Sequence, residues 1–275
     1  MTTEHTYITH GSYFKSFKYV IYILLTTNIF LFLHEESNAS LIRFSDGISL
    51  AAIYEVFPQT IDTLAWVVLL ILFELETYVF EDRTLNGLRL WTIHGVRFAC
   101  YIIIISALLG YISVLGWLNM YDAIDVTSAC QLIGQQLLVE ELNNFVVINA
   151  ENCSNYTNQI LLLHPNDGTL VVQTDYHDFI WLAWTDIINS ATWILVCIVL
   201  EYDVYLQLKH EVNHFIQKLS RIIKTFLYAI LFWAAIYWGY TGSILDFWDA
   251  FLWLVAFFLI ELNLFDWQTE VEEAQ

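Results

Sequence analysis

The chain has 275 residues, of which 58 % are hydrophobic, 17 % are aromatic and only 14 % are charged, and its formal net charge is −19. In an ordinary soluble domain about half of the residues are apolar and about a quarter are charged, so this composition excludes that class. The acidic balance also excludes a nucleic-acid partner, because such a surface repels phosphates and concentrates cations. The sequence therefore predicts a membrane protein whose main partner is the lipid bilayer.

Six apolar stretches are long enough to cross a bilayer, since a helix of about 20 residues spans the hydrocarbon core of roughly 30 Å. We predict an all-α polytopic membrane protein in which residues 1–34 hold a retained first helix, because no small-residue cleavage site follows the apolar run. The six predicted transmembrane helices are 17–34, 60–80, 96–117, 180–202, 221–240 and 244–265.

Basic residues indicate the orientation of these six helices. Only Arg43 lies on one side, and nine basic residues lie on the other. By the positive-inside rule both termini are cytoplasmic, and we expect a multi-pass protein of the plasma or inner cell membrane. The acidic tail at its C-terminus should fray unless it is docked. The nine inner basic residues are Lys15, Lys18, Arg83, Arg89, Arg97, Lys209, Lys218, Arg221 and Lys224. The predicted connections between the helices are an outer loop (35–59), an inner loop (81–95) and an inner amphipathic helix (203–220), and the acidic tail (266–275) follows the last helix.

Residues 118–179 are predicted to form a small α+β extracytoplasmic cap. This segment carries eight carboxylates and no Lys or Arg. Helical spacing over 131–145 predicts an amphipathic helix, and two β-prone runs around an Asn-Asp-Gly turn within 159–174 predict a hairpin. Cys130 and Cys153 both lie in this segment, where an oxidising compartment permits a disulfide, and we predict that they form one.

An internal repeat links the second, fourth and sixth predicted helices over residues 62–76, 189–203 and 249–263. Each begins with Asp or Asn, has a Trp four residues later, a Glu eight residues after that, and Glu, Asp or Asn two further on. Repetition of this kind predicts three hairpin repeats, with the Trp residues as packing residues. The repeated positions are Asp62, Asn189 and Asp249; Trp66, Trp193 and Trp253; Glu74, Glu201 and Glu261; and Glu76, Asp203 and Asn263.

The repeated acids are the candidate functional residues. An ionised carboxylate in hydrocarbon costs several kcal/mol, so such a group faces an interior or a wet cavity, or pairs with a base. We predict an ion or proton pathway from these residues. Two alternatives stay open, in which the acids are solvated at the helix ends or form structural salt bridges, with Arg97 and Arg221 as the expected partners. The pathway residues are Glu74, Glu201 and Glu261 at an inner level and Asp62, Asp186 and Asp249 at an outer level, with Glu76 and Asp203 as secondary acids.

Two functional hypotheses follow from these helices. The first is conduction or binding of protons or cations through the intramembrane carboxylates. The second is a non-conducting structural or accessory subunit, whose aromatic helices pack against a larger membrane complex. The protein partners that we expect are therefore a larger membrane complex or, for the first hypothesis, a homo-oligomer. Both prolines lie outside the predicted helices, which argues against an alternating-access transporter with broken helices.

A third hypothesis is a membrane zinc metallopeptidase, because residues 210–214 match the pattern HExxH. On a helix, His210 and His214 share a face and can hold zinc, while Glu211 can activate the metal-bound water. The stretch resembles the gluzincin and membrane metallopeptidase motif over these residues only. No third zinc ligand stands out, so we otherwise predict no cofactor and no enzymatic activity.

Overall fold

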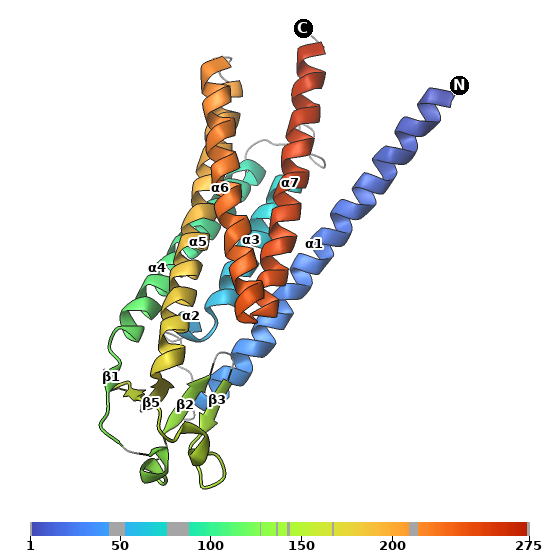
Figure 1. Ribbon diagram of the computed structural model, residues 1–275. Helices are drawn as coiled ribbons and strands as arrows, with labels where there is room; N and C mark the ends of the chain where they lie inside the picture. Colours follow the sequence, from blue (N-terminus) through green and yellow to red (C-terminus); the bar gives the residue numbers. More distant parts are fainter. Residues whose placement is uncertain are drawn as a thin grey trace. The chain divides into compact units, whose positions relative to one another are not determined.

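The structure is a computed structural model that describes residues 2–43, 53–75, 88–126, 128–135, 137–141, 144–166, 168–208 and 214–273, and it is mostly helical with one small sheet (Figure 1). The α-helices are α1 (Thr2–Arg43), α2 (Ile53–Val56), α3 (Pro58–Glu74), α4 (Leu88–Leu118), α5 (Gln173–Leu208), α6 (His214–Thr241) and α7 (Ile244–Glu273). The strands are β1 (Asp122–Ala123), β2 (Leu138–Glu141), β3 (Asn144–Val147), β4 (Leu161–Leu163) and β5 (Thr169–Val172), with 3-10 turns η3 (Ala129–Leu132) and η4 (Cys153–Tyr156).

The chain divides into two compact units. The helical unit consists of residues 1–34, 59–104 and 192–275, and the sheet unit consists of residues 35–58 and 105–191. Each unit has its own buried apolar core.

Four helices in the described part of the chain are long and apolar enough to cross a membrane: Lys15–Asn38, Trp91–Leu118, Gln173–Asp203 and Phe215–Thr241. They correspond to four of the six expected transmembrane helices. The other two stretches overlap α3 and α7: residues 60–74 of the stretch 60–80 belong to α3, which has only 17 residues, and the stretch 244–265 lies in α7. Helix α7 continues as far as Glu273, through a segment without Pro or Gly, and so includes residues 266–273 of the predicted tail.

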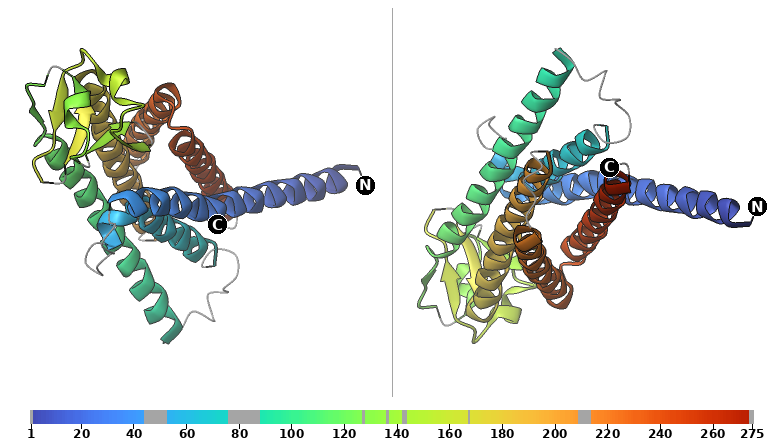
Figure 2. Two further views of the ribbon diagram at one scale, coloured as in Figure 1. Left: turned by 90° about the horizontal axis from the view of Figure 1, so that it is seen from below. Right: turned by 90° about the horizontal axis from the view of Figure 1, so that it is seen from above.

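The core of the helical unit takes apolar side chains from all six of its long helices. Leu25 in α1, Ile104 in α4, Val196 in α5 and Leu231 in α6 are almost fully buried there. Between them lie large aromatic residues of α3, α5 and α7. Figure 2 shows from two further sides that α6 and α7 run antiparallel next to each other, in agreement with their direct contact.

The turn between α6 and α7 has the sequence signals of a helix stop and a helix start. Gly242 has a left-handed φ of 93°, which glycine adopts without a Cβ penalty, and the amides of Gly242 and Ser243 both donate to the carbonyl oxygen of Trp238. Ser243 then donates from its hydroxyl group to the carboxylate of Asp246 in the first turn of α7. A polar turn of this kind joins two helices in antiparallel orientation.

The sheet unit contains a five-stranded sheet in the order β1-β4-β5-β2-β3, in which only the β2–β5 pair is parallel. The amphipathic helix expected over 131–145 was wrong, because this segment contributes to η3, β2 and β3 instead. Val139 pairs with Val146 on one side and with Leu170 on the other, and it is fully buried. Pairing on both edges satisfies the backbone of β2 and outweighs the helical spacing of its side chains.

Two predictions for the sheet unit are confirmed. The runs around the Asn-Asp-Gly turn form the antiparallel hairpin of β4 and β5, and Gly168 there has a left-handed φ of 70°. Cys130 and Cys153 form a disulfide, which joins η3 to η4 across a separation of 23 residues.

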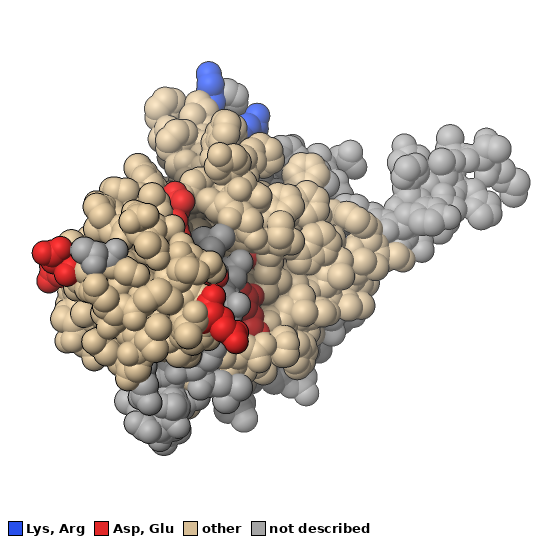
Figure 3. All heavy atoms as spheres, turned by 60° about the horizontal axis from the view of Figure 1, so that its bottom comes forward, with Lys and Arg blue, Asp and Glu red and all other residues tan. Residues whose placement is uncertain are grey.

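The acidic residues of the sheet unit are mostly solvated. On the face that Figure 3 presents, Asp and Glu side chains form small separate patches in a largely uncharged surface. A carboxylate in water needs no buried partner, so these residues carry no sign of an ion site. The exposed acids of this unit are Glu35, Asp122, Asp125, Glu141, Glu151, Asp175 and Asp178.

Removing the disulfide should destabilise the sheet unit selectively. Replacing Cys130 and Cys153 together by Ser frees a loop whose closure is worth about 3 kcal/mol by chain-entropy arguments. We expect a lower unfolding midpoint in urea, measured by near-ultraviolet circular dichroism. Adding a reductant should not change the midpoint of the variant. Cys197→Ala is the control, because Cys197 is a free thiol in α5. Equal midpoints for the wild type and the double variant would contradict the prediction.

Alkaline pH should also destabilise the sheet unit through Tyr156. Burial, and then the hydrogen bond of 2.8 Å that its hydroxyl group donates to Glu141, raise the pKa of Tyr156 from 10.0 to about 12. A raised pKa means that the folded state holds the proton more tightly than the unfolded state, so this stabilisation is complete below pH 10 and is lost between pH 10 and 12. Tyr156→Phe should lose stability less steeply in that window in urea titrations. The pH slope of Glu141→Gln should be intermediate, because Tyr156 is still buried in this variant but has lost its carboxylate partner. An unchanged pH slope in Tyr156→Phe would refute the assignment.

Candidate functional site

Three tryptophans, one from each predicted repeat, meet in the core of the helical unit. Trp66 in α3 lies 6.3 Å from Trp193 in α5 and 6.2 Å from Trp253 in α7, measured between ring centroids. Phe257 fills the space beside them, with its ring 4.6 Å from that of Trp193. All four are buried, so the expectation that these tryptophans are packing residues is confirmed.

The four-residue spacing of acid and Trp has a local structural reason. On a helix, residues four apart are neighbours on one face. Asp62 accepts a hydrogen bond from the side chain of Trp66, and Asp249 accepts one from the side chain of Trp253. The indole N–H thus holds the carboxylate one turn before it. The sequence contained this signal in the fixed spacing, although we did not expect this hydrogen bond.

The carboxylates of Asp62 and Asp249 come together in the helical unit. They are close enough to interact with each other electrostatically, and Asp249 also interacts with Asp246 one turn before it. Asp246 itself accepts hydrogen bonds from Gln59, at 3.1 Å, and from Ser243. Two of the three acids expected at the outer level are therefore neighbours. The third, Asp186, belongs to the sheet unit.

Asn28 completes this group, and sequence reasoning missed it. It lies in α1 within the apolar stretch Lys15–Asn38 and is only 1 % exposed. Its side-chain nitrogen Nδ2 donates to Oδ1 of Asp249 at 2.7 Å. A buried Asn among apolar residues was the available signal, because an amide in such a place needs partners. We call Asn28, Asp62 and Asp249 the aspartate–asparagine cluster.

Two oxygen atoms of the cluster are buried without a hydrogen-bond partner. They are Oδ1 of Asp62 and Oδ1 of Asn28. Each can accept hydrogen bonds or coordinate a cation through its lone pairs. The interior position and the unused acceptors distinguish this cluster from the solvated acids of the sheet unit.

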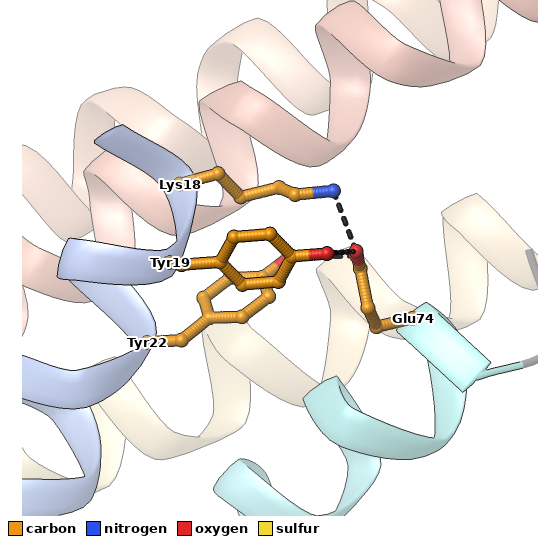
Figure 4. A network of polar contacts seen from close by, with 4 residues as sticks. All are labelled: Lys18, Tyr19, Tyr22 and Glu74. Carbon is orange, nitrogen blue, oxygen red and sulfur yellow. Dashed lines mark hydrogen bonds and ion pairs between the residues drawn. The ribbon is translucent and has the colours of Figure 1, made fainter. Parts of the chain in front are cut away.

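Glu74 has a different environment from the one that we expected. Its carboxylate accepts a charge-assisted hydrogen bond of 2.6 Å from Lys18, and both side chains are almost fully buried. The hydroxyl groups of Tyr19 and Tyr22 donate to the two carboxylate oxygens, each at 3.3 Å (Figure 4). The salt-bridge alternative thus holds for Glu74, but the partner is Lys18 in α1 rather than one of the two arginines.

The other inner acids also have separate partners. Glu201 is exposed and accepts a hydrogen bond from the hydroxyl group of Tyr101 in α4. Asp203 accepts from Ser220 at 2.6 Å and pairs with Lys224 at 3.3 Å, which links α5 to α6. The side chains of Glu76 and Glu261 lie outside the described residues. Glu74 and Glu201 therefore differ in both burial and partners.

The HExxH match falls largely outside the described residues. His210 and Glu211 are not described, and His214 is described only as the first residue of α6, without its side chain. Within the described part of the chain, no group of three or more His, Cys, Asp or Glu residues is arranged to hold a metal ion.

The geometry thus distinguishes a half-buried acidic cluster, which has two buried and unused oxygen acceptors, from inner acids with basic or hydroxyl partners. The first arrangement can bind a proton or a small cation, and the second stabilises contacts between helices. Comparison with protein-family models, curated proteins and solved structures finds no match to this chain. The chemistry of the site therefore has to be argued from its own residues.

Breaking the pair of Lys18 and Glu74 should destabilise the helical unit. Lys18→Met leaves a buried carboxylate without its cation, which costs about 3–5 kcal/mol when one partner of a buried pair is removed. The double variant Lys18→Met/Glu74→Leu should recover most of this loss, because no uncompensated charge is left. Thermal unfolding in detergent measures both. The control is Lys15→Met, one turn away and exposed; a loss as large as that of Lys18→Met would count against a specific pair.

Proposed function

We propose that this chain is a six-span membrane protein that binds and conducts protons or small cations through intramembrane carboxylates. It is built from three helical hairpins, with both termini in the cytoplasm and residues 118–179 as an extracytoplasmic cap. Its place is the plasma or inner cell membrane. The four membrane-length helices support this assignment, and the two further stretches, in α3 and α7, carry Asp62 and Asp249.

The observation that carries the proposal is the aspartate–asparagine cluster. Inside a membrane, ionisable residues are rare and usually mark ion or proton pathways. Asp62 and Asp249 lie beside each other, and among the described residues neither forms an ion pair with Lys or Arg. The charge on such a pair has to be compensated, and a mobile cation or proton compensates it directly.

The pair of Lys18 and Glu74 favours a different role for the inner acids. A carboxylate that already contacts an ammonium group at 2.6 Å has little remaining attraction for a second cation. We therefore assign ion binding to Asp62 and Asp249 and a structural role to Glu74. Glu261, the third acid of the inner level, stays a candidate pathway residue.

Flux measurements in liposomes test the proposal. The purified protein is reconstituted into liposomes that contain either a pH-sensitive or a sodium-sensitive dye, and a potassium diffusion potential drives protons or sodium ions inward. The double variant Asp62→Asn/Asp249→Asn should lose most of the flux. A loss of about 2.7 kcal/mol in the stabilisation of the passing ion corresponds to roughly a hundredfold decrease in rate.

The matched control replaces an acid of the same type elsewhere. Asp125→Asn removes a carboxylate that is exposed in the sheet unit, and flux should stay at the wild-type level. Glu74→Gln should affect stability more than flux in the fraction that folds. Wild-type liposomes without flux above that of empty liposomes would refute conduction, and equal flux in the double variant would refute the assigned site.

A second candidate function is that of a non-conducting structural or accessory subunit. The structural partners of Glu74, Glu201 and Asp203 favour it, because these acids are used in contacts between helices. Large aromatic side chains such as Trp233, 68 % exposed, and Tyr240, 88 % exposed, are available to a neighbouring subunit or to lipid. Gentle purification from native membranes separates the two functions, since migration as a lone chain or a small homo-oligomer would contradict the subunit hypothesis.

A further inference from the structure

We infer that the aspartate–asparagine cluster binds one proton, on Oδ1 of Asp62, and that this proton is donated in a hydrogen bond to Oδ1 of Asn28. The inference rests on the proposed function and makes it more specific, because it names the proton rather than a metal cation as the occupant of the site.

A count of donors and acceptors leads to this assignment. Three N–H donors reach the two carboxylates: the indole groups of Trp66 and Trp253, and Nδ2 of Asn28. They give Asp249 two donors and Asp62 one. Oδ1 of Asp62 and Oδ1 of Asn28 are left buried without a donor. Both unused atoms are acceptors, so the cluster has more acceptor atoms than donated hydrogens, and one further hydrogen would fit between them.

A single proton satisfies both atoms. On Oδ1 of Asp62 it converts an acceptor into an O–H donor, and the carbonyl oxygen of Asn28 is the acceptor without a partner. An unsatisfied buried polar group costs about 1–3 kcal/mol, so a proton that satisfies two of them is strongly favoured. Asn28 is only 1 % exposed, and its amide is already turned toward Asp249, so it is held in the cluster rather than in solvent.

The charges around the cluster favour the same state. Asp249 is flanked by Asp246 on α7 and faces Asp62 on α3, whereas α1 contributes the uncharged Asn28. Like charges at short distance do not ionise together, and one member of the pair keeps a proton. Asp249, with two donors, is the better anion, and Asp62, with one donor and a free oxygen, is the better acid.

A metal cation fits the donor set less well. Calcium takes six to eight oxygen ligands and magnesium requires near-octahedral coordination, whereas this cluster has only two unused oxygens and an indole group already donates to each carboxylate. The described residues also contain no group of three metal-binding side chains. Sodium is the remaining competitor, and the experiment distinguishes it from the proton.

Infrared spectroscopy of the full-length protein in lipid nanodiscs at neutral pH tests the inference. A protonated carboxylic acid has a carbonyl stretching band that a carboxylate lacks. The wild type should show one such band that Asp62→Asn removes and Asp125→Asn keeps. Asp62→Asn supplies an amide N–H in place of the acid O–H, so the variant should fold. Asn28→Ala, which removes the acceptor, should keep the band at a shifted frequency.

Each outcome decides the assignment. Loss of the band in Asp62→Asn together with its shift in Asn28→Ala supports a proton on Asp62. A band that persists unchanged in Asp62→Asn, a wild type without the band, or a wild-type band that sodium chloride abolishes relative to choline chloride would overturn it. Flux is a separate readout. A band without flux would support the proton site and refute conduction. Flux that depends on Asp62 without a band would support conduction and refute this proton site.

Discussion

A carboxylate buried among apolar helices needs compensation, and this constraint orders the polar contacts of the helical unit. An ionised group in hydrocarbon costs several kcal/mol unless a base, a donor or a proton compensates it. The chain has 29 acidic and only ten basic residues, so basic partners are scarce. Lys18 compensates Glu74, and Lys224 compensates Asp203. Asp62 and Asp249 have indole and amide donors instead.

The two kinds of compensation have different consequences. The cation that compensates Glu74 is a side chain of α1, so it cannot diffuse away as a free ion can. The pair of Lys18 and Glu74 therefore also holds α1 against α3. Neutral donors add no positive charge, so the charge of an aspartate that they contact is not compensated by a fixed cation. The three tryptophans of the core combine packing with hydrogen bonding. Trp66 and Trp253 pack against each other, and each also donates a hydrogen bond to an aspartate. The sheet unit needs no such device, since most of its acids are solvated.

Local signals predicted part of the structure well. The Asn-Asp-Gly turn led to the β4–β5 hairpin, and the two cysteines of the sheet unit led to the disulfide. The helical spacing over 131–145 was misleading, because β2 gains backbone partners on both sides from segments that are distant in the sequence. The site was predicted in part. The spacing of Asp62 and Asp249 to their tryptophans indicated a shared role, and Asn28 stands out as an amide in an apolar stretch, but the local pattern did not show that its partner is Asp249.

By itself the sequence determined the class of this chain, its long apolar helices and the residues that repeat along them, because hydropathy and periodicity are properties of neighbouring residues. Only the tertiary structure decided which acids have partners. Lys18 and Glu74 are 56 residues apart, and Asn28 and Asp249 are 221 apart. Contacts over such separations depend on how helices pack, and packing, rather than composition, distinguishes a neutralised carboxylate from one that is open to an ion.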